Sequence, residues 1–255
     1  MPAAQQPLRP PVISLASTKG GVGKTTLAYV LATAFATRLL SRKAGSPVCR
    51  NAGILPVFCI DADPNRILSQ ALQLTGMPKI RCIESDGDRL LNDLREASAE
   101  AAVVLIDLEG SANQAMLYAA GKSDLVLVPA QPSRFDVVEA VKTIGTVRTA
   151  ADLVGREILY RVVLSRTPVL RQRVADHSRQ QFVHANLPML NVELVQRTAF
   201  QTMTYTGEPP FRQDPDGSAA ANVNSLLDEV ADLVGLELLP ATATGGRTAA
   251  KAEAE

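Results

Sequence analysis

Short apolar runs alternate with longer amphipathic segments along most of the chain. Five mainly apolar runs predict strands, at 12–17, 56–61, 103–107, 125–129 and 160–165. Segments with apolar residues at helical spacing predict helices, at 24–40, 65–74, 86–99, 111–120, 134–151, 170–185 and 218–235. Because the runs are apolar on both faces and helices separate them, we expect a buried, mostly parallel sheet. The predicted fold class is α/β, a doubly wound sheet flanked by helices, with ligands bound beyond the carboxyl ends of its strands.

The two ends of the chain and one internal segment depart from this pattern. The start is rich in Pro, Gln and Ala and the end is small and polar, so we expect disorder over 1–11 and 239–255. One folded domain is predicted over 12–238. Between the first helix and the second strand, 41–56 is longer than usual connections and is expected to loop out over the surface.

Composition narrows the class of protein without naming a partner. The chain has 26 basic and 26 acidic residues, so its overall charge points to neither nucleic acid nor membrane. Its three cysteines have no C-x-x-C spacing, which argues against a disulfide framework and against a zinc or iron–sulfur site. There is neither an apolar run of membrane-spanning length nor a signal-peptide core at the start of the sequence. We therefore expect a soluble, cytoplasmic protein.

The stretch STKGGVGKTT at 17–26 joins the first predicted strand to the first predicted helix. It ends as the phosphate-binding pattern G-x-x-x-x-G-K-[ST] requires, at Gly23, Lys24 and Thr25, but it begins with Thr18 in place of glycine. A second lysine, Lys19, follows at once. The glycines allow a tight turn whose N–H groups face phosphates at a helix N-terminus. We expect Lys24 to reach the β and γ phosphates and the Thr25 hydroxyl to bind magnesium; a glycine-rich turn without a ligand is the alternative.

Acidic residues follow two of the predicted strands. Asp61 and Asp63 end the run PVFCIDAD, and Asp107 ends VVLID. A phosphate-binding loop needs carboxylates at neighbouring strand ends to hold the metal's water shell and to position the attacking water. A plain strand-terminating or helix-capping acid is the alternative for Asp107.

Four motifs together resemble the deviant Walker A ATPases of the ParA/MinD superfamily, in its short ParA type: KGGVGKTT, IDADPN at 60–65, LID at 105–107 and LVPAQPSRFDV at 127–137. The resemblance covers most of 12–237. It implies a P-loop fold and an Mg²⁺-dependent ATP hydrolase, slow and stimulated by a partner, that forms a homodimer on binding ATP. A weaker resemblance links the region after Asp107 and later segments to a subgroup on conjugative plasmids that assists DNA transfer.

The resemblance also implies roles for individual residues. Lys19 crosses the dimer interface to the partner's ATP, Lys24 serves its own nucleotide, and Asp63 orients the attacking water. Thr25, Asp61 and Asp107 form the metal site. The implied ATP-binding set consists of Lys19, Gly20, Gly21, Val22, Gly23, Lys24, Thr25 and Thr26, with Arg166 as an adenine contact.

Two stretches differ from the family's usual motifs. The usual D-x-P-P after the second acidic strand reads Asp107-Leu108-Glu109-Gly110, which leaves the shape of that loop and the hydrolysis rate open. The usual DPQ reads Asp63-Pro64-Asn65, and because Asn keeps an amide we expect little change.

Arginines are concentrated in one third of the chain. From 156 to 212 there are eight arginines, four acids and no lysine, and arginine suits phosphate binding. A solvated helix face is the alternative. The resemblance implies that the ATP-bound dimer binds DNA without sequence preference, and it places Arg197 near a DNA-contacting position. Local charge adds Arg171 and Arg173 as candidates.

The predicted function is an ATP-switched dimer that associates with the nucleoid and partitions or positions a cargo, in plasmid or chromosome segregation or in conjugative DNA transfer. A ParB-like protein or cargo adaptor is the implied partner. The alternative is a membrane-cycling ATPase of the MinD type. The last predicted helix region, NSLLDEVADLVGLELL, disfavours that alternative, because it carries acids and no Lys or Arg.

Overall fold

The centre of the molecule is a seven-stranded sheet in which every neighbouring pair of strands is parallel. The computed structural model describes residues 9–42, 55–170 and 173–241. In spatial order the strands are β4 (Ile80–Glu84), β3 (Leu55–Ala62), β5 (Ala101–Leu108), β1 (Val12–Leu15), β6 (Leu125–Ala130), β7 (Leu159–Thr167) and β8 (Leu194–Val195). This order confirms the predicted doubly wound α/β class.

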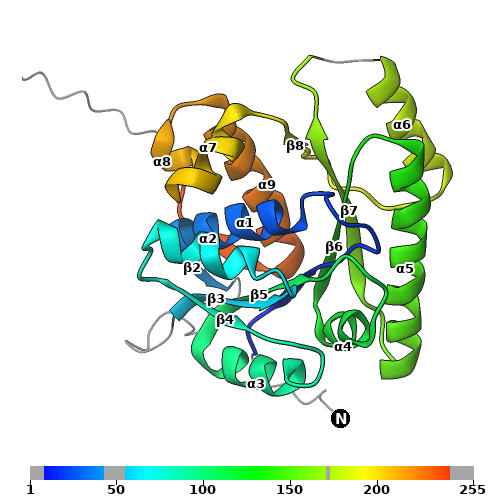
Figure 1. Cartoon of the computed structure of the whole chain (residues 1–255), viewed down its shortest axis with the longest axis horizontal. Coiled ribbons are helices and arrows are strands. Elements are labelled where there is room, and N and C mark those ends of the chain that lie inside the picture. Colours follow the sequence, from blue (N-terminus) through cyan, green and yellow to red (C-terminus); the bar gives the residue numbers. More distant parts are fainter. Residues whose placement is uncertain (1–8, 43–54, 171–172, 242–255) are drawn as a thin grey trace, which may run out of the picture.

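Helices cover both faces of the sheet (Figure 1). One face carries α1 (Lys24–Arg38), α2 (Ile67–Thr75), α7 (Thr198–Thr206), α8 (Pro210–Gln213) and α9 (Ser218–Val234). The other carries α3 (Leu90–Glu100), α4 (Gln114–Lys122), α5 (Arg134–Val154) and α6 (Arg173–His184). No helix within the described ranges is long and apolar enough to cross a bilayer.

Alternate residues of the central strands supply the two halves of the core. In β5, Val103 and Leu105 pack on the α1 side, whereas Val104 and Ile106 pack on the α3 side. All four side chains are fully buried, and burial of one such side chain contributes about 1.5–3 kcal/mol. This alternation explains why the buried strands read as continuous apolar runs.

The five predicted strands and seven predicted helices are all present, with shifted ends. Two edge strands were not predicted: β8 has two residues, and β4 interrupts its apolar residues with Arg81 and Glu84. The short helices α7 and α8 were also missed.

The predicted helix over 24–40 is wrong at its end. The helix α1 stops at Arg38, and β2 (Leu39–Arg42) pairs antiparallel with β9 (Leu236–Leu238) in a separate two-stranded sheet. The pairing partner lies about two hundred residues further along the chain, so no local pattern could show it. Most of the predicted surface loop over 41–56 lies outside the described residues, as do most of the extensions predicted at 1–11 and 239–255.

The register of the sheet places the acidic strand ends beside the first strand. Asp107 is the partner of Leu15 on one side and of Asp61 on the other. The carboxyl ends of β3, β5 and β1 therefore meet at one level, and the loop that follows β1 leaves the sheet beside Asp107.

Candidate nucleotide-binding site

The loop between β1 and α1 is an open cradle. Gly21 and Gly23 have φ angles of 77° and 96°, in the left-handed region that favours glycine. A Cβ atom added at Gly20 or Gly21 would meet no described atom within 4 Å, so space remains above the loop. Helix α1 begins at Lys24 without a side-chain cap from the described residues, which leaves its first N–H groups for a ligand. These features fit a phosphate group.

Two side contacts hold this loop against the sheet. The Val22 side chain is buried, and its carbonyl accepts a hydrogen bond of 2.7 Å from the Ser165 hydroxyl of β7. Gln131, just after β6, donates from Nε2 to the Gly21 carbonyl at 3.1 Å. Contacts from the ends of two neighbouring strands, β6 and β7, thus hold the loop without a ligand.

Lys24 lies beneath the loop among carboxylates. Its side chain is almost fully buried, and Nζ lies 3.5 Å from the Lys19 carbonyl oxygen. Burial lowers the pKa of Lys24, and the nearby Asp107, Asp63 and Glu109 oppose that shift. A cation held in this way is available for a bound phosphate.

Asp107 is the clearest candidate for a metal ligand. It is fully buried, and neither carboxylate oxygen has a hydrogen-bond partner among the described residues. Burial raises the pKa of Asp107 to about 7; Asp61 and Asp63 also raise it, while the Thr25 hydroxyl and Lys24 lower it. A buried carboxylate whose oxygens lack hydrogen-bond donors is costly, and a hard divalent cation is the partner that oxygen ligands of this kind prefer. Asp107 and the nearby Thr25 hydroxyl therefore fit Mg²⁺.

Asp61 has a different environment from Asp107. It is also fully buried, but Oδ1 accepts from the Asp63 N–H at 3.2 Å and Oδ2 from the Ser69 N–H at 2.9 Å. Burial raises the pKa of Asp61, and these backbone hydrogen bonds lower it. Asp61 thus shapes the segment between β3 and α2, and its predicted place in the metal site stays a prediction.

Asp63 is partly buried and is oriented by the residue that departs from the family motif. Its Oδ1 accepts hydrogen bonds from both the backbone N–H and the side-chain amide of Asn65, each at 2.9 Å. Asp63 lies close enough to Lys24 and Asp107 to influence the pKa of each. The amide of Asn65 holds the carboxylate that is predicted to orient water.

Lys19 is paired within its own chain. Its Nζ lies 3.0 Å from Oδ2 of Asp136, in the first turn of α5. Asp136 is 2% exposed and also accepts hydrogen bonds from the Ser133 hydroxyl and the Gln131 N–H. The sequence showed Asp136 only as part of the motif at 127–137, and its contact with Lys19 joins residues 117 positions apart.

Thr18, which replaces the first glycine of the usual pattern, also contacts α5. Its hydroxyl donates to Glu139 Oε2 at 2.7 Å, and its backbone N–H donates to Thr143 Oγ1 at 3.0 Å. The φ angle of Thr18 is not positive, so the backbone does not need glycine here. The loop therefore does not need glycine at position 18. The Thr18 side chain instead connects the loop to α5.

The loop after β5 lies directly on the phosphate-binding loop. A Cβ atom on Gly110 would lie 2.9 Å from the Gly20 nitrogen and 3.1 Å from the Lys19 carbonyl carbon. Only glycine fits this approach without a shift of backbone. The departure from D-x-P-P at Gly110 is thus coupled to the position of the phosphate-binding loop.

A pocket of about 710 Å³ continues from this loop toward β7 and β8. Its lining includes Thr26, Gln131 and Arg166, with Phe200 and Tyr205 of α7. Arg166 is exposed and has a φ angle of 52° at the end of β7. The pocket brings the predicted adenine contact next to the loop and offers room for a nucleoside.

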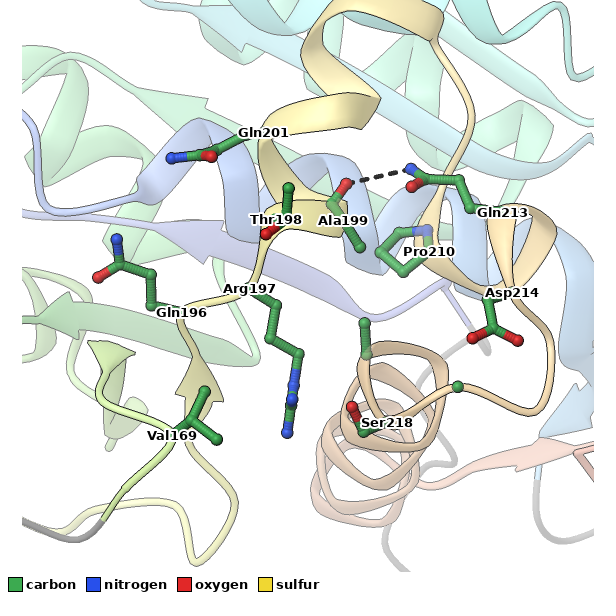
Figure 2. Close-up of a pocket in the computed structure, with 12 residues that line it drawn as sticks. Val169, Gln196, Arg197, Thr198, Ala199, Gln201, Pro210, Gln213, Asp214 and Ser218 are labelled. Carbon is green, nitrogen blue, oxygen red and sulfur yellow. Dashed lines mark hydrogen bonds between the residues drawn. The ribbon is translucent and has the colours of Figure 1, made fainter.

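The predicted DNA-contacting arginines are only partly described. Arg171 lies outside the described residues, and Arg173 begins α6 with its side chain outside them. Arg197 lines a second pocket of about 450 Å³, where Figure 2 shows it projecting between Val169 and Ser218. Its Nε is buried and has no hydrogen-bond partner among the described residues. Arg197 is therefore less open to a DNA backbone than a surface arginine.

Two other arginines of this region make contacts within the chain. Arg179 pairs with Asp176 and Glu193, and Arg156 donates to the carbonyls of Gly121 and Ser123. Part of the local excess of positive charge therefore belongs to arginines that already have partners within the chain.

Similarity to known proteins agrees with this site. No family model matches the chain. The curated protein ParA of Rhizobium radiobacter is 26% identical over 219 residues, which are 84% of this chain and 92% of that protein. This similarity to a ParA protein supports the resemblance to the ParA/MinD superfamily that the sequence motifs carry. Thr18, Lys19 and Lys24 lie in the loop whose sequence resembles the deviant Walker A motif of that superfamily.

Solved structures show the same fold at low identity. Apo McdA of Cyanothece superposes with a TM-score of 0.69 at 18% identity, over 88% of this chain and 99% of that one. An ATP complex of a McdA variant gives a TM-score of 0.68 at 17% identity, over 90% and 98% of the two chains. MinD of Pyrococcus horikoshii, complexed with Mg-ADP, gives 0.65 at 18% identity over 88% and 97%.

Proposed function

We propose that this protein is an Mg²⁺-dependent ATPase that pairs with a second copy on binding ATP and thereby partitions or positions a cargo. The observation that carries the proposal is the pair Lys19–Asp136, 3.0 Å apart, beside an open phosphate-binding loop. ATP binding by the loop alone would not need a second lysine at that place.

ATP and Mg²⁺ are supported by the chemistry of the loop. Gly20 and Gly21 leave room for phosphates, and Lys24 supplies a buried positive charge. Asp107 and Thr25 would hold the magnesium ion, which neutralises phosphate charge when bound. Solved relatives with bound ATP or Mg-ADP give further support.

Dimerisation is supported by how Lys19 is held. The Lys19 side chain is 40% exposed although Asp136 is buried, so its ammonium group lies at the surface beside the loop. When Lys19 leaves, Asp136 keeps its hydrogen bonds from Ser133 and the Gln131 N–H. The lysine can therefore exchange Asp136 for the phosphates of a partner's ATP without leaving an unpaired buried carboxylate.

The proposal also includes three interactions. The ATP-bound dimer binds DNA, associates with the nucleoid and acts with a ParB-like or cargo-adaptor partner. The name of the ParA relative and the excess of arginine over 156–212 support them. The candidate contacts are Arg171, Arg173 and Arg197. DNA binding through such residues would require ATP and weaken steeply with salt.

The decisive experiment compares Lys19→Ala with the unchanged protein by multi-angle light scattering in ATP, in ADP and without nucleotide. We expect an ATP-dependent dimer for the unchanged protein and a monomer for K19A, with binding of a fluorescent ATP analogue retained. Lys122→Ala, an exposed lysine at the end of α4, is the matched control and should dimerise normally. If K19A forms the ATP-dependent dimer to the same extent as the unchanged protein, Lys19 has no role in dimerisation.

Membrane cycling of the MinD type is less favoured. The sequence of α9 contains Asp228, Glu229 and Asp232 and no basic residue, and anionic lipid repels such a helix. Co-sedimentation with anionic vesicles in ATP tests this alternative directly.

A further inference from the structure

Glu109 follows β5 and lies two residues after Asp107. Successive residues of a strand point to opposite faces, so residues two apart share one face. Val103 and Leu105 pack on the α1 side. The alternation of the strand places Asp107 on that side as well. The next position on this side is Glu109, one residue after β5 ends at Leu108. Glu109 is followed directly by Gly110, whose backbone lies against Gly20 of the phosphate-binding loop.

The orientation of Glu109 is fixed by the start of α4. The Asn113 side-chain oxygen caps this helix by accepting from the Met116 N–H at 3.0 Å. Since the oxygen is committed to the cap, the amide nitrogen must face the other way, and it donates to Glu109 Oε2 at 3.1 Å. One Glu109 oxygen is thus held, and the carboxylate cannot turn freely into solvent.

The neighbourhood of Glu109 is the candidate nucleotide site. Glu109 lies close enough to Lys24 to influence the pKa of that amine. The adjacent Gly110 packs against Gly20, with a Cβ position only 2.9 Å from the Gly20 nitrogen. Backbone contact and charge therefore both join the Glu109 loop to the phosphate-binding loop.

We propose that Glu109 is a second active-site carboxylate, which accepts a hydrogen bond from the water that attacks ATP and orients it together with Asp63. The inference rests on the proposed ATPase function. In the reaction the water oxygen forms a bond to the γ-phosphorus, and the bond from that phosphorus to the β,γ-bridging oxygen breaks. Its electron pair stays on ADP, and the water proton passes to the phosphate product. Glu109 orients the water and takes up no proton in this scheme.

Asp63 alone is poorly suited to orienting the attacking water. Its Oδ1 already accepts hydrogen bonds from the backbone N–H and the side-chain amide of Asn65. This oxygen is therefore less available to a water molecule. Phosphoryl transfer depends mostly on positioning, and two fixed acceptors define the direction of a water molecule better than one.

The test follows one turnover of ATP in the full chain. Purified protein is mixed with Mg²⁺ and a substoichiometric amount of ATP, quenched at intervals, and the ATP and ADP are separated by chromatography. Glu109→Gln keeps the shape and an acceptor for Asn113 but removes the charge. Because the attacking water loses one of its two orienting acceptors, we expect E109Q to slow the conversion to ADP by about 10-fold to 100-fold. Its affinity for a fluorescent ATP analogue and its melting temperature should stay near those of the unchanged protein.

Two further variants separate orientation from structure. Asn113→Asp keeps an oxygen that can cap α4 but removes the amide donor to Glu109, so it should slow turnover without loss of ATP binding. Glu157→Gln, at an exposed position before β7 and at the opposite edge of the sheet, should have no effect.

Turnover by E109Q within about 3-fold of the unchanged protein would overturn the proposal. So would a slower E109Q that has also lost ATP affinity, because Glu109 would then only shape the loop. If the unchanged protein neither binds nor hydrolyses ATP, the proposed function itself fails, and this result is distinct from a defect confined to E109Q.

Discussion

Lys19 Nζ and Asp136 Oδ2 lie 3.0 Å apart, and they join the phosphate-binding loop to the first turn of α5. The adjacent Thr18 contacts the same helix through Glu139 and Thr143. Two consecutive residues of the loop are therefore tied to one helix, which gives a route by which events at α5 could reach a bound nucleotide.

Asp136→Asn should favour the ATP-bound dimer. The neutral amide still fits beside Ser133 but no longer holds Lys19 by charge, so the lysine is released more easily. A partly exposed ion pair contributes up to about 1 kcal/mol, and the ATP concentration for half-maximal dimerisation should fall about 5-fold or less. Fluorescence energy transfer between labelled copies measures this. A weaker dimer in D136N would show that Asp136 helps pairing.

The stability of the nucleotide-free protein should depend on the ionisation of Asp107. Burial raises the pKa of Asp107 from 3.8 to about 7, so the folded state binds its proton more tightly than the unfolded state does. The stabilisation by protonated Asp107 is fully present below about pH 4 and is lost as the pH rises through about 7. Asp107→Asn removes this loss and should raise the free energy of unfolding at pH 8, by at most about 4 kcal/mol.

Urea unfolding of both proteins from pH 5 to pH 8 checks this prediction. The difference between D107N and the unchanged protein should grow with pH, and a difference that is constant across this range would contradict it. The rise in melting temperature on adding Mg-ATP should be smaller in D107N, because this variant removes the carboxylate that is proposed to bind the metal.

Replacement of Thr18 by glycine should not improve the site, although it restores the usual pattern. Thr18→Gly deletes the hydroxyl that donates to Glu139 and loosens the loop, which should cost about 1 kcal/mol in unfolding free energy. The affinity for ATP should stay unchanged or fall. Thr18→Ser, which keeps the hydroxyl, is the matched control and should behave as the unchanged protein does. A T18G protein that binds ATP more tightly would contradict the anchoring role of Thr18.

Local signals in the sequence predicted the sheet and led to the candidate site, but they could not predict contacts between distant segments. The runs that end at Asp61 and Asp107, and the loop around Lys24, were readable because each carries its own pattern. The partner of Lys19 lies in a helix 117 residues away, and β9 pairs with β2 across most of the chain. Nothing near Lys19 or Leu39 in the sequence encodes such a neighbour.

The segment after β5 shows the same limit. Its departure from D-x-P-P was visible, but the reason for Gly110 was not, since the close approach of Gly20 exists only in the folded chain. Buried Asp61 and Asp107 read alike in the sequence. They differ in the structure because backbone N–H groups reach the oxygens of Asp61, whereas no described group hydrogen-bonds those of Asp107.

Gly110→Ala should impair nucleotide binding more than it impairs folding. The added methyl group would lie 2.9 Å from the Gly20 nitrogen, so the phosphate-binding loop must shift to accept it. Since a displaced loop no longer directs its N–H groups at the phosphates, we expect ATP affinity to fall about 10-fold or more in a fluorescent-analogue titration. Gly145→Ala is the matched control, because a Cβ atom there meets no described atom within 4 Å and alanine suits the interior of α5. That variant should bind ATP normally and unfold at a slightly higher temperature. A G110A protein with unchanged affinity would show that the loop after Asp107 is independent of the phosphate-binding loop.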